Sequence, residues 1–298
     1  MKYIVAGHIF QIKGLHLYES IAQRLSVPYG PFSVKDNNDL NCDPLFVFEL
    51  VEQELTWETN EAIFSNIGNV EPGFVGLSLY KDNGGFHFEF SHGRSTYING
   101  RLSIGSDIKR ARMYLSGNNQ DKWATFNIGV ICCYMLATTE FKTLLVHSSC
   151  VKYRGKAYIF LGKSGTGKST HSQMWIKALD DVELINDDHP VIRINDMGEA
   201  IVYGSPWSGK TQCYINTFAP LGGIVRISRA LYNKASRMTP VQAYGSLLTS
   251  SCGIAWEQEL ANGRDMTLQQ IIKSVPSWLM ECLPNEDAAL VCSSVIVQ

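Results

Sequence analysis

The sequence lacks several features that mark common classes of protein. Its 8 cysteines form no C-x-x-C pair and no zinc-type spacing, so we expect reduced, mostly buried thiols and no disulfide framework. The longest apolar run, residues 128–137, is too short to span a bilayer. A formal net charge of -2 argues against general binding to nucleic acid or to a membrane surface.

Targeting and linker signals are also missing. Residues 1–8 become polar too soon for a signal peptide, which favours a cytoplasmic protein. The chain of 298 residues suits one large or two ordinary domains, and neither a proline-rich stretch nor a charge run divides it. The composition, 45% hydrophobic and 18% charged, is typical of a soluble globular protein.

The most informative stretch present is G-K-S-G-T-G-K-S at residues 162–169. An apolar run at residues 157–161 precedes it and predicts a buried strand, and apolar positions at helical spacing follow it. A strand before and a helix after distinguish a phosphate-binding loop from a chance match to G-x-x-x-x-G-K-[ST]. A glycine-rich turn with a solvated lysine is the alternative interpretation.

Each residue type in this loop suits a polyphosphate. Glycines allow positive φ angles that turn N–H groups inward, and the start of a helix adds the positive end of its dipole. Lys168 is expected to reach the β and γ phosphates, and Ser169 to offer its hydroxyl to Mg²⁺. We therefore predict ATP with Mg²⁺, or Mn²⁺ in its place. The residues expected to contact the nucleotide are Gly162, Lys163, Ser164, Gly165, Thr166, Gly167, Lys168, Ser169 and Thr170.

Two adjacent carboxylates, Asp187 and Asp188, follow the next predicted strand at residues 182–185. Such neighbours repel each other unless a cation or a proton offsets the repulsion. A Mg·ATP site does so: one aspartate can hold the metal while the other accepts a proton from an acceptor hydroxyl. The sequence does not distinguish the two roles. A strand-ending turn with solvent-facing acids, followed by Pro190, is the alternative.

A second string, at residues 204–211, also matches the phosphate-loop pattern. Pro206 has no N–H to offer, and Trp207 fills space where the backbone would have to approach a phosphate closely. We therefore predict that this string is not an ATP site. It is better interpreted as a loop that brings Trp207 and Lys210 to the acceptor or to the transferred phosphate.

Taken in order, these motifs resemble the kinase domain of HPr kinase/phosphorylase-like proteins, the HPr serine kinase C-terminal domain. The resemblance covers about residues 140–245. The loop and the D-D-H string are also similar to ATP-dependent phosphoenolpyruvate carboxykinase, which shares that nucleotide fold. The motifs are H-S-S at 147–149, G-K-S-G-T-G-K-S-T at 162–170, I-N-D-D-H at 185–189, G-S-P-W-S-G-K at 204–210 and A-P-L at 219–221.

The resemblance implies roles for individual residues. Lys168 and Ser169 match the phosphate-loop lysine and the metal-binding hydroxyl of the family. Asp187 and Asp188 match the acidic pair that holds metal and serves as general base. His147 matches a histidine that lies at the metal or the phosphate; without the resemblance it would be interpreted as a core histidine.

Departures from the family concern the substrate. The glycine-arginine signature of HPr kinases is not evident at residues 223–229, which contain Arg226 and Arg229, and this argues against HPr as the acceptor. The chain is far shorter than a phosphoenolpyruvate carboxykinase and shows no counterparts of its oxaloacetate-binding residues. Other small proteins with this domain act on free serine or on peptides.

We predict an α/β fold with two domains. Residues 121–298 are expected to form a mixed-sheet P-loop kinase domain of the phosphoenolpyruvate carboxykinase and HPr kinase type, and residues 1–120 a β-rich domain of unknown role. A helix capped by Asp121 bridges them, and a turn at residues 261–264 leaves room for a lid. The other expected elements are strands at 3–12, 45–50, 74–80, 86–90, 144–149 and 278–282, and helices at 239–248, at 266–273 and from Asn285.

The predicted function is that of a cytoplasmic, ATP- and Mg²⁺-dependent kinase that transfers the γ-phosphoryl group to a hydroxyl, with serine of a small molecule, peptide or protein as the expected acceptor. A nucleotide-gated binding module without transfer and a carboxykinase-like enzyme are the alternatives. ATP and the acceptor are the expected partners, nucleic acid and membrane are not, and a homo-oligomer is compatible with the sequence. The predicted catalytic residues are Asp187, Asp188, Lys168, His147 and Lys210.

Overall fold

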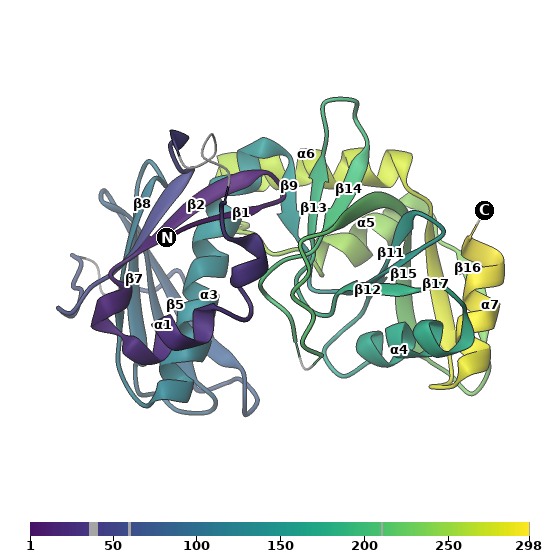
Figure 1. The fold of residues 1–298 in the computed structure, drawn as a ribbon, viewed down its shortest axis with the longest axis horizontal. Coiled ribbons are helices and arrows are strands. Elements are labelled where there is room, and N and C mark those ends of the chain that lie inside the picture. The colour runs from purple at the N-terminus through teal and green to yellow at the C-terminus, as the bar shows by residue number, and fades with distance from the viewer. Residues whose placement is uncertain (36–40, 59–60, 210, 298) are drawn as a thin grey trace. The chain divides into compact units, whose positions relative to one another are not determined.

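The computed structural model describes residues 1–35, 41–58, 61–209 and 211–297 (Figure 1). Contacts divide the chain into two compact units, Met1–Ala137 and Thr138–Gln298. Each unit contains one mixed β-sheet, so the protein is a mixed α/β protein with two such sheets. The division falls later than the predicted boundary near residue 120.

The first unit is organised around a sheet of eight strands in the order β1-β2-β3-β8-β7-β6-β5-β4 among the described residues. Strand β3 pairs in parallel with β2 and with β8, and the other pairs are antiparallel. The elements are β1 (Lys2–Val5), β2 (His8–Lys13), α1 (Glu19–Leu25), β3 (Phe46–Leu50), β4 (Phe64–Ser65), β5 (Val75–Asp82), β6 (Gly85–His92), β7 (Gly100–Gly105), β8 (Arg110–Leu115) and α3 (Asn119–Thr138), with 3-10 turns at Leu15–Leu17 and Gly30–Phe32.

Helix α3 belongs to the first unit because it packs on this sheet. The Tyr134 hydroxyl donates to the carbonyl of Val5 at 2.9 Å. Gly129 lies so close to β8 that a Cβ there would be 2.7 Å from the Met113 sulfur. The helix begins two residues before the predicted cap: the Asn118 side chain accepts the N–H groups of Gln120 and Asp121, so Asn118 takes the role expected of Asp121.

Within the described residues, one helix, α3 extended to Phe141, is long and apolar enough to cross a membrane by length and composition alone. Of its most apolar window, 67% is buried inside the structure. Core helices pass the same test, and the ring contacts of Phe126 with Phe48 and Tyr29 are those of a core helix.

Other predictions for the first unit need correction. The strand expected at residues 3–12 is two strands, because Ala6 and Gly7 both have positive φ and form a turn. His87 and Glu89 share a face as predicted, but this face is not open to solvent: His87 is buried under the stacked ring of Trp57 and bonds to Asp82 and Ser103.

The second unit is built on a sheet with the path β12-β10-β11-β15-β14-β13-β9, to which β17 adds beside β15 and β16 beside β17. Strand β15 pairs in parallel with β11 and with β17. The elements are β9 (Thr143–Leu145), β10 (Ser149–Tyr153), β11 (Lys156–Leu161), α4 (Lys168–Ala178), β12 (Glu183–Asn186), β13 (Val191–Ile194), β14 (Ala200–Tyr203), β15 (Phe218–Arg229), β16 (Lys234–Arg237), α5 (Pro240–Leu248), α6 (Gln258–Ser274), β17 (Ser277–Cys282) and α7 (Glu286–Ile296), with a 3-10 turn at Thr139–Phe141.

Helices cover both faces of this sheet (Figure 1). On one face, Leu247 of α5 and Leu268 of α6 join a core cluster with alternate residues of β11 and β15. On the other face, Trp175 of α4 and Cys292 of α7 pack on the intervening residues of the same strands. The apolar run before the loop is buried on both sides, as parallel strands in α/β proteins are.

Several predicted elements of the second unit differ from the structure. Residues 144–149 do not form one strand, because the chain leaves β9 and enters β10 around His147 and Ser148. The turn expected at residues 261–264 lies inside α6, so it forms no lid. The caps expected at Thr239 and Asn285 are present, and Thr239 forms a capping box with Gln242.

A pH dependence of folding stability follows from His171 of α4. Burial lowers the pKa of His171 to about 4, and its Nε2 accepts the indole N–H of Trp175 at 3.1 Å. The unfolded chain therefore takes up this proton near pH 6.5, before the folded chain does, so stability is full above pH 6.5 and falls towards pH 4. We expect His171 to account for a loss of roughly 3 kcal/mol over that interval.

The measurement is urea unfolding from pH 7.5 to pH 4 of the wild type and of His171→Gln, whose amide oxygen can still accept the Trp175 N–H. The variant should lose less stability over this interval than the wild type. Equal slopes in the two proteins would contradict the assignment of the neutral imidazole.

Candidate functional site

The loop between β11 and α4 has the predicted strand-loop-helix form. Strand β11 ends at Leu161, and α4 begins at Lys168 with Gly167 as its N-cap. Gly165 and Gly167 have φ angles of 76° and 109°, which L side chains rarely adopt. These glycines therefore allow a backbone conformation that would be strained for any other residue.

Side chains brace this loop. The Thr166 hydroxyl donates to the carbonyl of Lys163 at 2.8 Å, and the Arg229 guanidinium at the end of β15 donates to the carbonyl of Gly165. Lys163, Ser164 and Gly165 are exposed. The tip of the loop is thus open to a ligand while its shape is held from inside and from β15.

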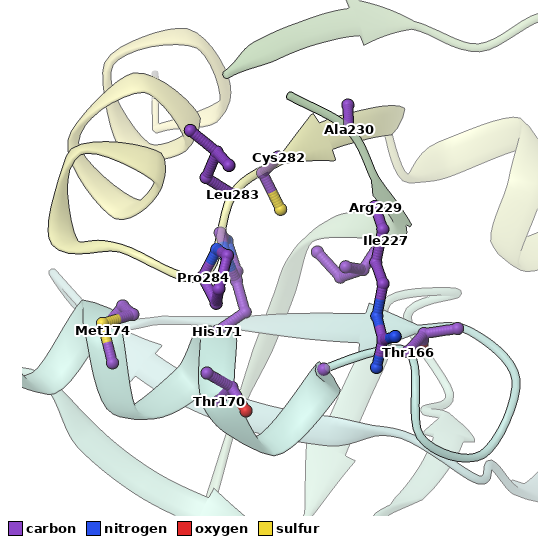
Figure 2. Close-up of a pocket in the computed structure, with 11 residues that line it drawn as sticks. Thr166, Thr170, His171, Met174, Ile227, Arg229, Ala230, Cys282, Leu283 and Pro284 are labelled. Carbon is purple, nitrogen blue, oxygen red and sulfur yellow. The ribbon is translucent and has the colours of Figure 1, made fainter. Parts of the chain in front are cut away.

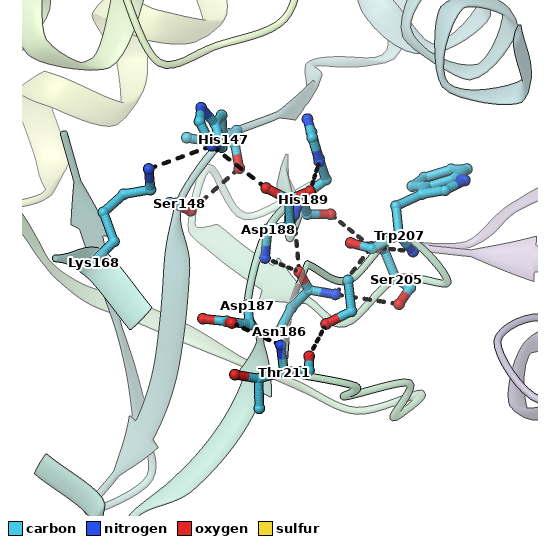
Figure 3. Close-up of polar contacts among 12 residues, drawn as sticks. His147, Ser148, Lys168, Asn186, Asp187, Asp188, His189, Ser205, Trp207 and Thr211 are labelled. Atoms are coloured by element: carbon cyan, nitrogen blue, oxygen red, sulfur yellow. Dashed lines mark hydrogen bonds and ion pairs between the residues drawn. The ribbon is translucent and has the colours of Figure 1, made fainter. Parts of the chain in front are cut away.

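Lys168 points to the centre of the site (Figure 3). Its Nζ donates to the carbonyl of Gly162 at 3.1 Å and lies 3.3 Å from Nε2 of His147. Burial lowers the pKa of Lys168, and the charges of Asp188 and Asp187 oppose that shift. A lysine that is 8% exposed and hydrogen-bonded to uncharged groups is suited to meet an incoming anion.

Two hydrogen-bond donors fix Asp187 just after the end of β12. Its Oδ1 accepts the Ser149 hydroxyl at 2.8 Å, and its Oδ2 accepts the N–H of Thr211 at 3.3 Å. Ser149 also bonds to Ser172 of α4 at 2.6 Å. Because Ser169 and Ser172 are three residues apart on α4, they lie on one face of the helix, so Asp187 lies along the face that carries Ser169.

Asp188 is the more accessible acid. Its side chain is 33% exposed, whereas Asp187 is 5% exposed. Its Oδ1 lies 3.4 Å from Nε2 of His147, and its Oδ2 lies 3.1 Å from Nδ1 of His189. His147 therefore stands between the loop lysine and the second acid.

The two histidines carry different charges. Burial, together with the charge of Lys168, lowers the pKa of His147 to about 4, so this imidazole is neutral near pH 7. Burial also lowers the pKa of His189, but the adjacent Asp188 carboxylate outweighs it and raises the net value. Burial raises the pKa of Asp188, yet His189, His147 and Lys168 hold it below its usual range. Asp188 and His189 thus form an ion pair.

A polar scaffold behind the acids was not predicted. Asn186 is buried, and its Oδ1 accepts the N–H groups of Asp188 and His189 at 2.9 Å each, while its amide donates to Ser205. The Ser205 hydroxyl donates to the carbonyl of His189 at 2.6 Å. The I-N-D-D-H string contained this signal, because Asn is well suited to turn a chain after a strand.

The described residues of the second glycine-lysine string, 204–209 and 211, lie beside the acids, and they do not lead into a helix as the first string does. No helix occurs in residues 211–217, which follow it. Trp207 is 3% exposed, and its carbonyl accepts the N–H of His189 at 3.2 Å, so it supports the acids from within rather than facing solvent as an acceptor contact would. Gly209 lies against Asp187 and Asp188. Lys210 lies outside the described residues.

A cavity of about 320 Å³ opens beside the loop, on the face covered by α4 and α7 (Figure 2). Thr170 and Met174 of α4 line one side, and Ile227 and Arg229 of β15 line another. Leu283, in the segment between β17 and α7, closes it. Its size and partly apolar lining match those of small-molecule pockets.

The side-chain oxygens near the loop are too few to hold a metal ion by themselves, but they suit Mg²⁺ that arrives bound to a nucleotide. Within the described part of the chain, no group of three or more His, Cys, Asp or Glu side chains is placed to hold a metal. Mg²⁺ in nucleotide sites needs only one or two protein oxygens, because phosphate oxygens and waters complete its coordination. Ser169 and Asp187, along the same face of α4, supply that number.

Comparisons with known proteins add little. No family model matches the chain, and no curated protein sequence matches it. Among solved structures, the chain is similar to the Hpr(Ser) kinase/phosphatase from Coxiella burnetii, with 9% sequence identity, a TM-score of 0.30, and coverage of 51% of this chain and 87% of that chain. A likeness this weak carries no argument, and the site stands on its own geometry.

A stability prediction follows from the buried bond between Ser149 and Asp187. Ser149→Ala should lower the free energy of unfolding by about 1–3 kcal/mol, because it removes a donor from a buried carboxylate. Ser294→Ala, at an exposed helix position, is the matched control and should change it by less than about 0.5 kcal/mol. Urea unfolding at pH 7.5 measures both, and equal midpoints for Ser149→Ala and wild type would contradict the bond.

Proposed function

We propose that this protein is an ATP- and Mg²⁺-dependent kinase that transfers a γ-phosphoryl group to a hydroxyl. The proposal rests on one observation: the lysine of the loop, Lys168, and an acid, Asp188, both lie next to the imidazole of His147. The imidazole Nε2 of His147 lies 3.3 Å from Nζ of Lys168 and 3.4 Å from Oδ1 of Asp188 (Figure 3). A phosphate-binding lysine and a proton acceptor at one point are the two groups that phosphoryl transfer requires.

The nucleotide would lie across the start of α4. The N–H groups of the loop and the Lys168 ammonium would surround the β and γ phosphates, where the helix dipole also favours negative charge. The cavity beside Met174 and Leu283 would hold the nucleoside, since it opens next to Thr166 and Gly167 of the loop. This placement supports a nucleotide rather than free phosphate as the ligand.

In the transfer step, the acceptor oxygen forms a bond to the γ-phosphorus while the bond to the β–γ bridging oxygen breaks, and ADP leaves. The acceptor proton passes to the Asp188 carboxylate, the more exposed of the two acids. Ser169 and Asp187 would hold Mg²⁺, which neutralises phosphate charge when bound. Lys168 stabilises the negative charge of the transferring group.

The second candidate is a binding module in which ATP is held without transfer. The ion pair of Asp188 with His189 favours this alternative only if it survives in the presence of ATP, because a paired carboxylate is a weaker proton acceptor. A carboxykinase-like reaction remains a third alternative from the sequence. Incubation with γ-labelled ATP and a panel of serine, serine peptides, cell extract and oxaloacetate separates the three.

Two substitutions test the roles of the lysine and the acid. Lys168→Ala should weaken ATP binding by roughly 100-fold, since a charged hydrogen bond contributes about 1.5–3 kcal/mol. Asp188→Asn should keep ATP binding but lower the transfer rate by about 10²–10⁴-fold, because the amide accepts no proton. Titration calorimetry measures the first effect and label transfer the second. Equal turnover of both variants and wild type would refute the assignment.

The nucleoside cavity is tested by filling it. Ala230→Phe should weaken ATP binding by roughly 10-fold through overpacking, while tripolyphosphate, which has no nucleoside, should bind as in the wild type. Leu231→Phe is the matched control, because Leu231 is 92% exposed and follows directly in the chain. Competition binding against a fluorescent nucleotide gives both affinities. Parallel losses for ATP and tripolyphosphate would place the nucleoside elsewhere.

A further inference from the structure

A second cavity, of about 480 Å³, lies in the same unit on the face of the sheet covered by α5. Strands β15, β16 and β17 contribute its floor, and α5 contributes one wall. Its charged lining residues are Arg226 of β15 and Arg237 of β16, and no acidic residue lines it within the described part of the chain. The cavity therefore has a positive potential without a built-in counter-ion.

Arg226 is placed in this cavity by the strand register. It pairs with Leu161, the residue before the phosphate-binding loop, and with Leu279 of β17. It is half-buried, and its guanidinium has no hydrogen-bond or ion-pair partner among the residues that the structure describes. A guanidinium without a protein partner keeps its N–H donors available to an anion.

Arg237 is oriented by an aromatic ring. Its guanidinium carbon lies 4.7 Å from the centroid of the Trp278 ring, and Trp278 is 4% exposed and held in the core. Trp278 belongs to the core cluster on the face covered by α4 and α7, and Arg237 pairs directly with Trp278 across β16 and β17, so its guanidinium lies on that face. Arg226, which pairs with Leu279, is the arginine on the face of the cavity.

This cavity adjoins the proposed transfer site. Thr249 of its lining is followed by Ser250, whose carbonyl accepts the N–H of His147 at 2.7 Å. A shallower hollow of about 510 Å³ has Arg226 and Leu279 in common with the cavity, and its remaining lining includes Lys163–Thr166 of the loop. An occupant of the cavity would therefore have the loop on one side and His147 on the other.

From these contacts we infer that the cavity binds the phosphoryl acceptor, and that the acceptor is a small molecule with an oxyanion group, carboxylate or phosphate, held by Arg226. This inference rests on the proposed kinase function. The oxyanion anchors one end of the acceptor, and its hydroxyl lies towards Asp188, which takes the proton. The cavity volume is that of a site for a small molecule.

Direct binding tests the oxyanion site without any transfer. Glycerate, glycerol 3-phosphate and the neutral glycerol are titrated calorimetrically into the full chain. We expect at least one of the anions to bind and glycerol not to bind in the same range, and the stronger anion identifies carboxylate or phosphate as the preferred group. Binding of glycerol as tight as that of both anions, or no binding of either anion, overturns the inference.

Substitutions locate the anion. Arg226→Gln should weaken its binding by at least about 10-fold, whereas Arg237→Gln, whose side chain lies on the other face of the sheet, should not. Arg226→Lys should retain part of the affinity, because lysine keeps the positive charge but cannot bind the oxyanion with two parallel N–H donors. The control Lys234→Gln removes a charge from an exposed residue of the same strand, β16, and should have no effect. Unchanged affinity in Arg226→Gln overturns the inference.

Two further measurements separate this inference from the proposed function. If Arg226→Gln weakens ATP binding and leaves anion binding intact, Arg226 belongs to the nucleotide and the inference fails. If the anions bind through Arg226 but take no label from γ-labelled ATP, the oxyanion site stands and the kinase proposal fails. If glycerol and glycerate are labelled equally, in wild type and in Arg226→Gln, the kinase stands and the oxyanion site fails.

Discussion

The parallel pairing of β11 with β15 is the constraint on which the site in the second unit depends. Parallel strands bring their carboxyl ends to one edge of a sheet, and ligands bind outside such edges. Leu161, the last residue of β11, pairs with Arg226, so the loop that follows opens directly beside the end of β15. The loop, the cavity next to α4 and Arg226 belong to one edge of the sheet, although the chain separates them widely.

A buried polar network fixes the acids on the adjacent strand. A carboxylate as buried as that of Asp187 is tolerated because the Ser149 hydroxyl and the N–H of Thr211 both donate to it. The Asn186 side chain likewise fixes the next two residues, because its Oδ1 accepts the backbone N–H groups of Asp188 and His189. Two segments distant in sequence, together with the neighbouring Asn186, thus fix the positions of both acids, and such rigidity is what a preorganised site requires.

Local sequence signals predicted the parts of this arrangement that are local in the chain. The loop from Gly162, the helix after it and the cap at Asn285 each depend on neighbours a few residues away. The break in the chain at His147 and the length of α6 were missed, because both depend on packing against distant strands. Arg226 lies beside the loop because β15 pairs with β11 in the sheet. The order of strands in a sheet cannot be predicted from the periodicity of a single segment.

Helix α3 is a second example in which local sequence predicts an element but not where it packs. Its apolar residues were recognised as a helix, but its assignment to the first unit depends on a hydrogen bond to Val5 and on the close approach of Gly129 to Met113.

Lys168 illustrates what long-range packing adds to a motif. Its two hydrogen-bond acceptors are a carbonyl and a neutral imidazole. An anion that reached Lys168 would therefore displace a carbonyl and an imidazole and would break no ion pair, while the charges of Asp188 and Asp187 would continue to act on the ammonium.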